Sequence, residues 1–126
     1  MLFDYLIFGI GSGLGGMVRY LLATDPVLGF AQVGHPVDTM VVNAIGSFIA
    51  GFTVSLSARA LTPAGRSFLI GLAGGITTYS AFSLETVQFL QHVHLMQAAL
   101  YASASVVTYV AAAAAGFVAA DWVERV

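Results

Sequence analysis

Long apolar stretches alternate with short polar breaks along the whole chain. The stretches cover residues 2–23, 37–58, 66–91 and 95–121. Each is at least as long as the roughly 20 apolar residues that an α-helix needs to cross a bilayer. Two of the three breaks between them hold proline, at Asp25-Pro26, His35-Pro36 and Thr62-Pro63. This pattern predicts an all-α integral membrane fold, with four transmembrane helices in a single domain over residues 1–126.

The composition supports the membrane assignment and excludes several functions. Hydrophobic residues make up 59% of the 126 residues and charged residues only 8%, whereas soluble domains carry about 25% charged residues. A chain this short cannot bury so much apolar surface within itself. It has no cysteine and no lysine, so thiolate chemistry is excluded and no nucleic acid partner is expected. Since no nucleophile–base pair or paired carboxylate is apparent, we predict that the protein is not an enzyme.

The arginines set the membrane orientation only weakly. Four spans place both termini and the middle loop on one side, together with Arg59, Arg66 and Arg125, while Arg19 lies on the other. This excess favours cytoplasmic termini, but it is small enough to suit insertion in both orientations. Four thin helices can hardly enclose a protected pathway alone, so a transport function predicts an oligomer.

The third apolar segment holds the most unusual pattern. Its centre reads Gly74-Gly75-Ile76-Thr77-Thr78-Tyr79-Ser80-Ala81-Phe82-Ser83. Glycine, threonine and serine all weaken a helix. A break in the middle of the membrane would free main-chain groups, which survive there only if they line a cavity or bind an ion. The alternative is a continuous helix whose hydroxyls bond back to their own carbonyls.

Polar residues within the other spans are further candidates. Asn43 lies in an uncharged run, where its amide could either join two helices or donate to a dehydrated anion. Glu85 is the acidic residue nearest to the middle of a span, which favours a buried or vestibule role. Along the last span, hydroxyls recur on one face at Tyr101, Ser105 and Thr108. They predict either a polar groove or helix packing.

Taken together, the motifs resemble those of the Fluc, or CrcB, family of fluoride channels over almost the whole chain. The motifs that carry the resemblance are Gly11-Ser-Gly-Leu-Gly15-Gly16-Met-Val-Arg19-Tyr20, Thr39-Met-Val-Val-Asn43-Ala-Ile-Gly46, and Gly74-Gly75-Ile-Thr77-Thr78-Tyr79-Ser80-Ala81-Phe82-Ser83-Leu-Glu85. Their order and spacing, rather than any one of them, are specific.

The resemblance implies an antiparallel, dual-topology homodimer with two fluoride pores in the bacterial inner membrane, exporting fluoride passively. It also implies a central sodium ion, held by the main-chain carbonyls of Gly74 and Thr77. The family's pore residues correspond to Asn43, Tyr79, Phe82 and Tyr101. The hydroxyls of Thr39, Ser80 and Ser83 can donate to fluoride as well, and Glu85 completes the predicted pore.

Three positions depart from the family pattern, and two alternative functions remain. Tyr79 replaces the usual phenylalanine, Ala81 a threonine, and Tyr109 aligns with a serine. These departures predict slower conduction or a heterodimer. A small four-helix, dual-topology multidrug exporter is the main alternative, but it needs a buried carboxylate on its first helix, where this chain has only Asp4 at the very end. A non-transporting membrane scaffold explains the glycines but not the third segment.

Overall fold

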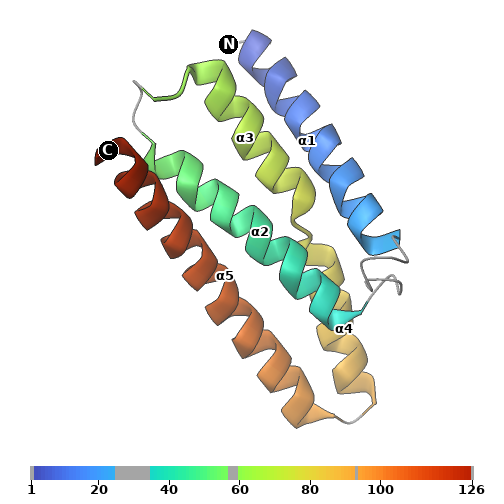
Figure 1. Ribbon diagram of the computed structural model, residues 1–126. Coiled ribbons are helices and arrows are strands. Elements are labelled where there is room, and N and C mark those ends of the chain that lie inside the picture. The colour runs from blue at the N-terminus through green and yellow to red at the C-terminus, as the bar shows by residue number, and fades with distance from the viewer. Residues whose placement is uncertain (1, 25–34, 57–59, 93, 126) are drawn as a thin grey trace.

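The computed structural model describes residues 2–24, 35–56, 60–92 and 94–125, and these form a bundle of α-helices (Figure 1). The helices are α1 (Leu2–Thr24), α2 (Pro36–Ser55), α3 (Pro63–Ile76), α4 (Tyr79–Gln91) and α5 (Leu95–Arg125). The predicted first, second and fourth spans correspond to α1, α2 and α5. The predicted third span is divided into α3 and α4.

Two of the prolines that the sequence places in loops instead begin helices. Pro36 is the first residue of α2, preceded by His35, whose ring nitrogen Nδ1 accepts a hydrogen bond from the Val37 N–H at 3.3 Å. Pro63 is the first residue of α3, and the Thr62 hydroxyl accepts from the Gly65 N–H at 3.1 Å. Proline suits this position because the first helical N–H has no partner within the helix. The third span therefore begins before the predicted residue 66.

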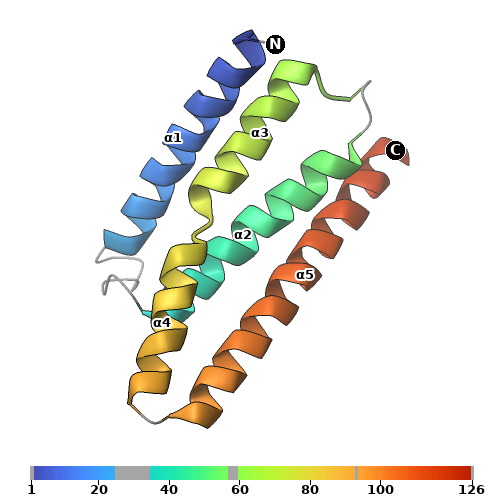
Figure 2. The same ribbon diagram turned by 180° about the vertical axis from the view of Figure 1, so that it is seen from behind.

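The helices lie in two closely packed pairs, α1 with α3 and α2 with α5, and α4 extends beyond the end of α3 (Figures 1 and 2). Glycines let the main chains approach. A Cβ atom on Gly15 would lie 2.3 Å from the Leu72 carbonyl oxygen, and one on Gly75 would lie 2.1 Å from that of Ser12. Such contacts are typical of membrane helices, whose association depends on close packing.

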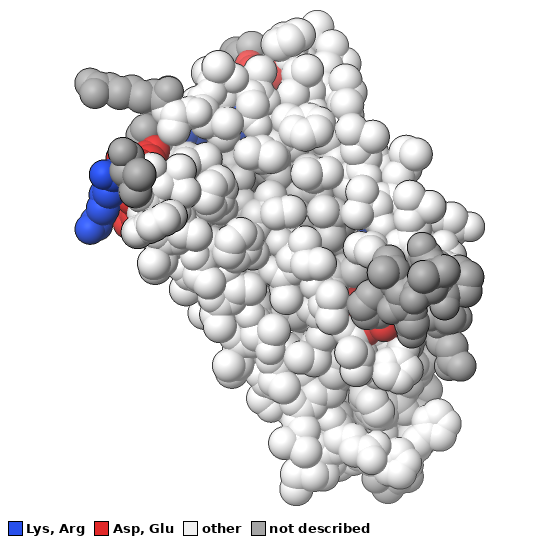
Figure 3. All heavy atoms as spheres, viewed as in Figure 1, with Lys and Arg blue, Asp and Glu red and all other residues white. Residues whose placement is uncertain are grey.

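Most large apolar side chains on the bundle point outwards. Leu6 is 60% exposed, Val107 67% and Val118 65%. The four stretches Leu2–Leu22, Pro36–Ser55, Pro63–Gln91 and Leu95–Arg125 are long and apolar enough to cross a membrane. In the space-filling view, uncharged atoms cover most of this face and the visible charges form a few small groups (Figure 3). The chain is therefore a multi-pass membrane protein.

Arg66 ties the start of α3 to the end of α2. Its guanidinium donates to the Thr53 carbonyl at 3.0 Å and to the Leu56 carbonyl at 2.6 Å. These are carbonyls at the helix C-terminus, which have no partner within α2 and carry partial negative charge. The Ser55 hydroxyl also donates to the Asp121 carboxylate of α5 at 2.7 Å. This end of the bundle is thus held together by polar contacts among three helices.

Candidate functional site

The interruption between α3 and α4 is the centre of the candidate site. Thr77 and Thr78 separate the two helices and both have extended main-chain conformations. The Thr77 N–H still donates to the Ala73 carbonyl at 3.1 Å, which closes the last turn of α3. The Thr78 hydroxyl accepts from the Ala81 N–H at 3.3 Å and so caps the start of α4. The predicted interruption is therefore present, and its depth in a membrane stays a prediction.

The Asn43 side chain of α2 pairs with the main chain of this interruption. Its Oδ1 atom accepts from the Thr78 N–H at 2.6 Å, and its Nδ2 donates to the Thr78 carbonyl at 3.1 Å. The same Nδ2 also donates to the Tyr109 hydroxyl of α5 at 3.2 Å. Asn43 is only 5% exposed. One amide therefore satisfies both main-chain groups of Thr78, which an apolar surrounding would otherwise leave unpaired at high cost. We call this pairing the Asn43–Thr78 clamp.

Four aromatic rings surround the clamp and the start of α4. The Phe82 ring lies with its centroid 5.8 Å from that of Tyr79, 5.6 Å from that of Tyr101 and 6.3 Å from that of Tyr109. The Phe82 and Tyr109 rings meet nearly at right angles, with 74° between their planes. Tyr79 is 80% exposed on the surface of the protomer. Phe82 is therefore the central ring of the cluster, and Tyr79 is its outer one.

Glu85 lies one turn beyond Phe82 on α4 and is buried between α2 and α5. The Thr39 hydroxyl donates to one carboxylate oxygen at 2.6 Å, and the Tyr101 hydroxyl donates to the other. Glu85 is 3% exposed and Ser105, one turn along α5 from Tyr101, is fully buried. Among the residues that the structure describes, none makes a hydrogen bond to the Ser105 hydroxyl. A hydrogen-bonded carboxyl group thus lies about two turns along α4 from the Asn43–Thr78 clamp.

The remaining predicted residues lie around the interruption with local partners. The Ser83 hydroxyl donates to the Tyr79 carbonyl at 3.0 Å, and the Ser80 hydroxyl shares a hydrogen bond with that of Thr78 at 3.2 Å. The Thr77 hydroxyl donates to the Gly74 carbonyl at 3.3 Å. No atom from elsewhere in the described chain would come within 4 Å of a Cβ on Gly74. The end of α3 at Gly74 is therefore open on the protomer surface.

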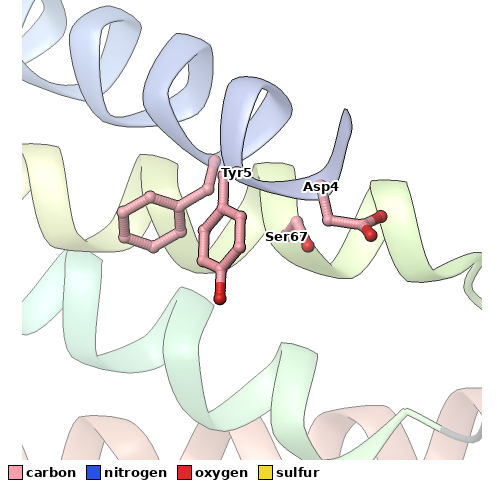
Figure 4. A pocket seen from close by; sticks show the side chains of 4 residues that line it. Asp4, Tyr5 and Ser67 are labelled. Atoms are coloured by element: carbon pink, nitrogen blue, oxygen red, sulfur yellow. The ribbon is translucent and has the colours of Figure 1, made fainter. Parts of the chain in front are cut away.

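A hollow lies between the first turns of α1 and α3 (Figure 4). These turns are at the opposite end of α3 from the interruption (Figure 1). Its lining consists of Asp4, Tyr5, Phe8 and Ser67. None of these residues belongs to the cluster of Asn43, Phe82 and Glu85. The hollow is therefore separate from the candidate site.

Comparison with known proteins identifies the family. A family model described as CrcB-like protein, Camphor Resistance (CrcB), matches residues 6–117. The chain belongs to the CrcB family. A relative from Thermus thermophilus, named "Fluoride-specific ion channel FluC", is 43% identical over 103 residues, which are 80% of this chain and 82% of the relative. One of the same name from Ruegeria sp. is 37% identical over 121 residues, 95% of this chain and 96% of the relative.

The CrcB match confirms the family that the motifs indicated. It also agrees with the expectation that the protein is not an enzyme, because the relatives are named as ion channels. The structure brings most of the predicted pore residues together at one stretch of the bundle. The roles of these residues in fluoride transport stay predictions, as does sodium binding at the carbonyls of Gly74 and Thr77.

Two residues of the site were not singled out from the sequence for the contacts that they make. Thr78 provides both main-chain partners of the Asn43 amide, and Tyr109 provides the third. Tyr109 follows Tyr101 by eight residues, so it lies near the face that Tyr101 and Ser105 define on α5. This spacing could have added Tyr109 to the site, whereas nothing in the sequence near Asn43 points to Thr78.

Proposed function

We propose that this protein is a fluoride-selective channel, through which fluoride leaves the cell passively across the bacterial inner membrane. The observation that carries the proposal is the cluster beside the interruption. There the Phe82 ring packs against Tyr109, which bonds the Asn43 amide, and against Tyr101, which bonds the buried Glu85. Curated relatives named as fluoride-specific channels support the same function.

The chemistry of the cluster suits a small, strongly hydrated anion. Fluoride gives up its water only if other donors replace it, and amide and hydroxyl groups of the kind found at Asn43, Thr39 and Ser80 can donate. An aromatic ring is positive at its edge, so Phe82 and Tyr79 can also face an anion edge-on. The N-terminus of α4 lies at the same place and carries partial positive charge. Contacts of this kind, each weak, allow an ion to bind and to leave again.

A second protomer in the opposite orientation is part of the proposal. The open end of α3 at Gly74 and the exposed Tyr79 ring lie on one protomer's surface, and an antiparallel homodimer would cover them. A reporter fused to the C-terminus should give signal from both sides of the membrane. Signal from one side alone contradicts the dual-topology dimer.

Sodium binding at the centre of the dimer is also proposed. The interruption ends α3 and leaves its last carbonyls without helical partners, and oxygen atoms of this kind suit a hard cation. The Gly74 and Thr77 carbonyls would hold the ion, and its positive charge would lower the cost of placing an anion nearby. We expect fluoride efflux to depend on sodium, and equal rates after its replacement by a larger organic cation contradict this role.

Efflux from liposomes that contain only this protein tests the channel function. We expect fluoride efflux above that of empty liposomes and no chloride efflux above it. Comparable rates for the two halides contradict the proposal. The multidrug-exporter alternative predicts instead that a lipophilic cation moves in response to a pH gradient while fluoride does not.

A further inference from the structure

Tyr109 reaches from α5 to the amide that the proposed function assigns to fluoride. Its hydroxyl oxygen accepts a hydrogen bond from Asn43 Nδ2 at 3.2 Å. Its ring packs edge-on against Phe82, with the centroids 6.3 Å apart. Where the family resemblance leads us to expect a short serine side chain, this chain has a long one that extends into the cluster. Position 109 therefore carries a hydroxyl that bonds directly to the Asn43 amide.

In this structure, Asn43 has no spare hydrogen for an incoming anion. An amide nitrogen carries two hydrogens, and those of Asn43 go to the Thr78 carbonyl at 3.1 Å and to the Tyr109 hydroxyl. The amide oxygen is used as well, because it accepts from the Thr78 N–H. An anion that binds this amide must first displace one of its two acceptors.

The two acceptors differ in how easily they can be displaced. Thr78 is held at both its N–H and its carbonyl by the same amide, and a freed main-chain carbonyl in an apolar surrounding has no replacement partner. The Tyr109 hydroxyl makes this one hydrogen bond within the described chain. Its departure leaves no main-chain group unpaired.

We propose that Tyr109 is a positioning residue that caps Asn43, and that fluoride binds the amide by displacing the Tyr109 hydroxyl. The inference rests on the proposed function and adds to it a residue that sets the apparent affinity. Opening the cap has the same free-energy cost whichever anion follows. Tyr109 therefore weakens the binding of every anion by one common factor and leaves the ratio between halides unchanged.

The size of that factor follows from the bond that is broken. The net strength of one neutral hydrogen bond corresponds to about a two- to tenfold change in an equilibrium constant. Tyr109→Phe removes the hydroxyl and keeps the ring that packs on Phe82. We expect the fluoride concentration that gives half-maximal efflux to fall by about two- to tenfold in this variant.

The experiment measures initial efflux rates from proteoliposomes over a range of fluoride concentrations, with chloride in parallel. Tyr20→Phe serves as the matched control, since Tyr20 is 67% exposed on α1, and it should leave the half-maximal concentration unchanged. Tyr109→Met, which also lacks the hydroxyl, should shift the value in the same direction as Tyr109→Phe, so the result does not depend on one variant folding well.

Each outcome decides the matter. A lower half-maximal concentration, with chloride efflux still no greater than that of empty liposomes, supports the cap. An unchanged or higher half-maximal concentration, or chloride efflux above that of empty liposomes in the variant alone, overturns the cap while the proposed channel function stands. A wild-type protein that passes no fluoride overturns the proposed function and the cap together.

Discussion

Replacing Asn43 by leucine tests whether the Asn43–Thr78 clamp holds the interruption in place. Leucine has nearly the same shape as asparagine but can neither donate nor accept a hydrogen bond. The variant therefore removes both hydrogen bonds to Thr78, of 2.6 and 3.1 Å, and the one to Tyr109. Little cavity is created, so the main effect should come from the unpaired groups.

The magnitude follows from what is left unpaired. A buried main-chain group that loses its only partner costs about 1–3 kcal/mol. Thr78 is half-buried and would lose the Asn43 partner of both its N–H and its carbonyl, so each group should fall in the lower part of this range. The expected destabilisation of Asn43→Leu is therefore about 2–4 kcal/mol. In a chain of this size, that corresponds to a fall of at least about 6 °C in the unfolding midpoint.

Two measurements check this expectation. The first follows the fraction of monodisperse protein that survives stepwise heating in detergent. The second follows hydrogen exchange in a peptide that contains Thr78, where Asn43→Leu should speed exchange because the N–H has lost its acceptor. Ser47→Ala provides the control, since Ser47 lies one turn further along α2 and is only half-buried. If Asn43→Leu and Ser47→Ala have the same unfolding midpoint, and hydrogen exchange at Thr78 stays slow, the clamp does not hold the interruption.

Three further predictions concern the rings and the glycine contacts. Phe82→Ile should abolish or severely slow fluoride efflux while the protein still assembles. An aliphatic side chain roughly keeps the apolar volume but has no positive ring edge. Efflux at the parent rate contradicts the role of the ring. Tyr79→Phe removes one hydroxyl. If that hydroxyl slows the exit of fluoride, the variant should show faster efflux with unchanged halide selectivity. A slower rate indicates instead that the Tyr79 hydroxyl is a necessary donor to fluoride. Gly15→Ala should destabilise the protein by about 1–3 kcal/mol, as overpacking does, because the added methyl group would lie 2.3 Å from the Leu72 carbonyl oxygen. Gly13→Ala is the matched control, because no atom from elsewhere in the described part of the chain lies within 4 Å of the added Cβ. Equal melting temperatures of the two variants contradict the tight contact.

The spans could be predicted from the sequence because each depends on local composition. The interruption of the third span was also foreseeable, since glycines and hydroxyl residues that weaken a helix gather between Gly74 and Ser83. The exact position of the interruption, at Thr77 and Thr78, could not be predicted, because several neighbouring residues weaken the helix equally. The structure places it where the Asn43 amide reaches the main chain.

Contacts between distant helices account for what the sequence left open. Asn43 and Thr78 are separated by 35 residues, and Thr39 and Glu85 by 46, so no local pattern links either pair. The hydroxyls of Thr39 and Ser83 were predicted as donors to fluoride. The structure shows Thr39 donating to Glu85 on another helix, a contact that depends on packing. Ser83 instead donates to the Tyr79 carbonyl one turn earlier on its own helix, the local bond that the sequence had left open as an alternative.

The clamp has a consequence for how this protein can change during evolution. Asn43 holds main-chain atoms of Thr78, and every amino acid except proline offers the same N–H and carbonyl. The main-chain shape of the interruption between α3 and α4 therefore depends on Asn43 of α2 rather than on the side chains of the interruption itself. A library of random substitutions should tolerate many residues at position 78, above all those that can cap α4, and very few at position 43. Substitutions of side chains at the interruption can therefore change the permeation rate while the main chain keeps the same path.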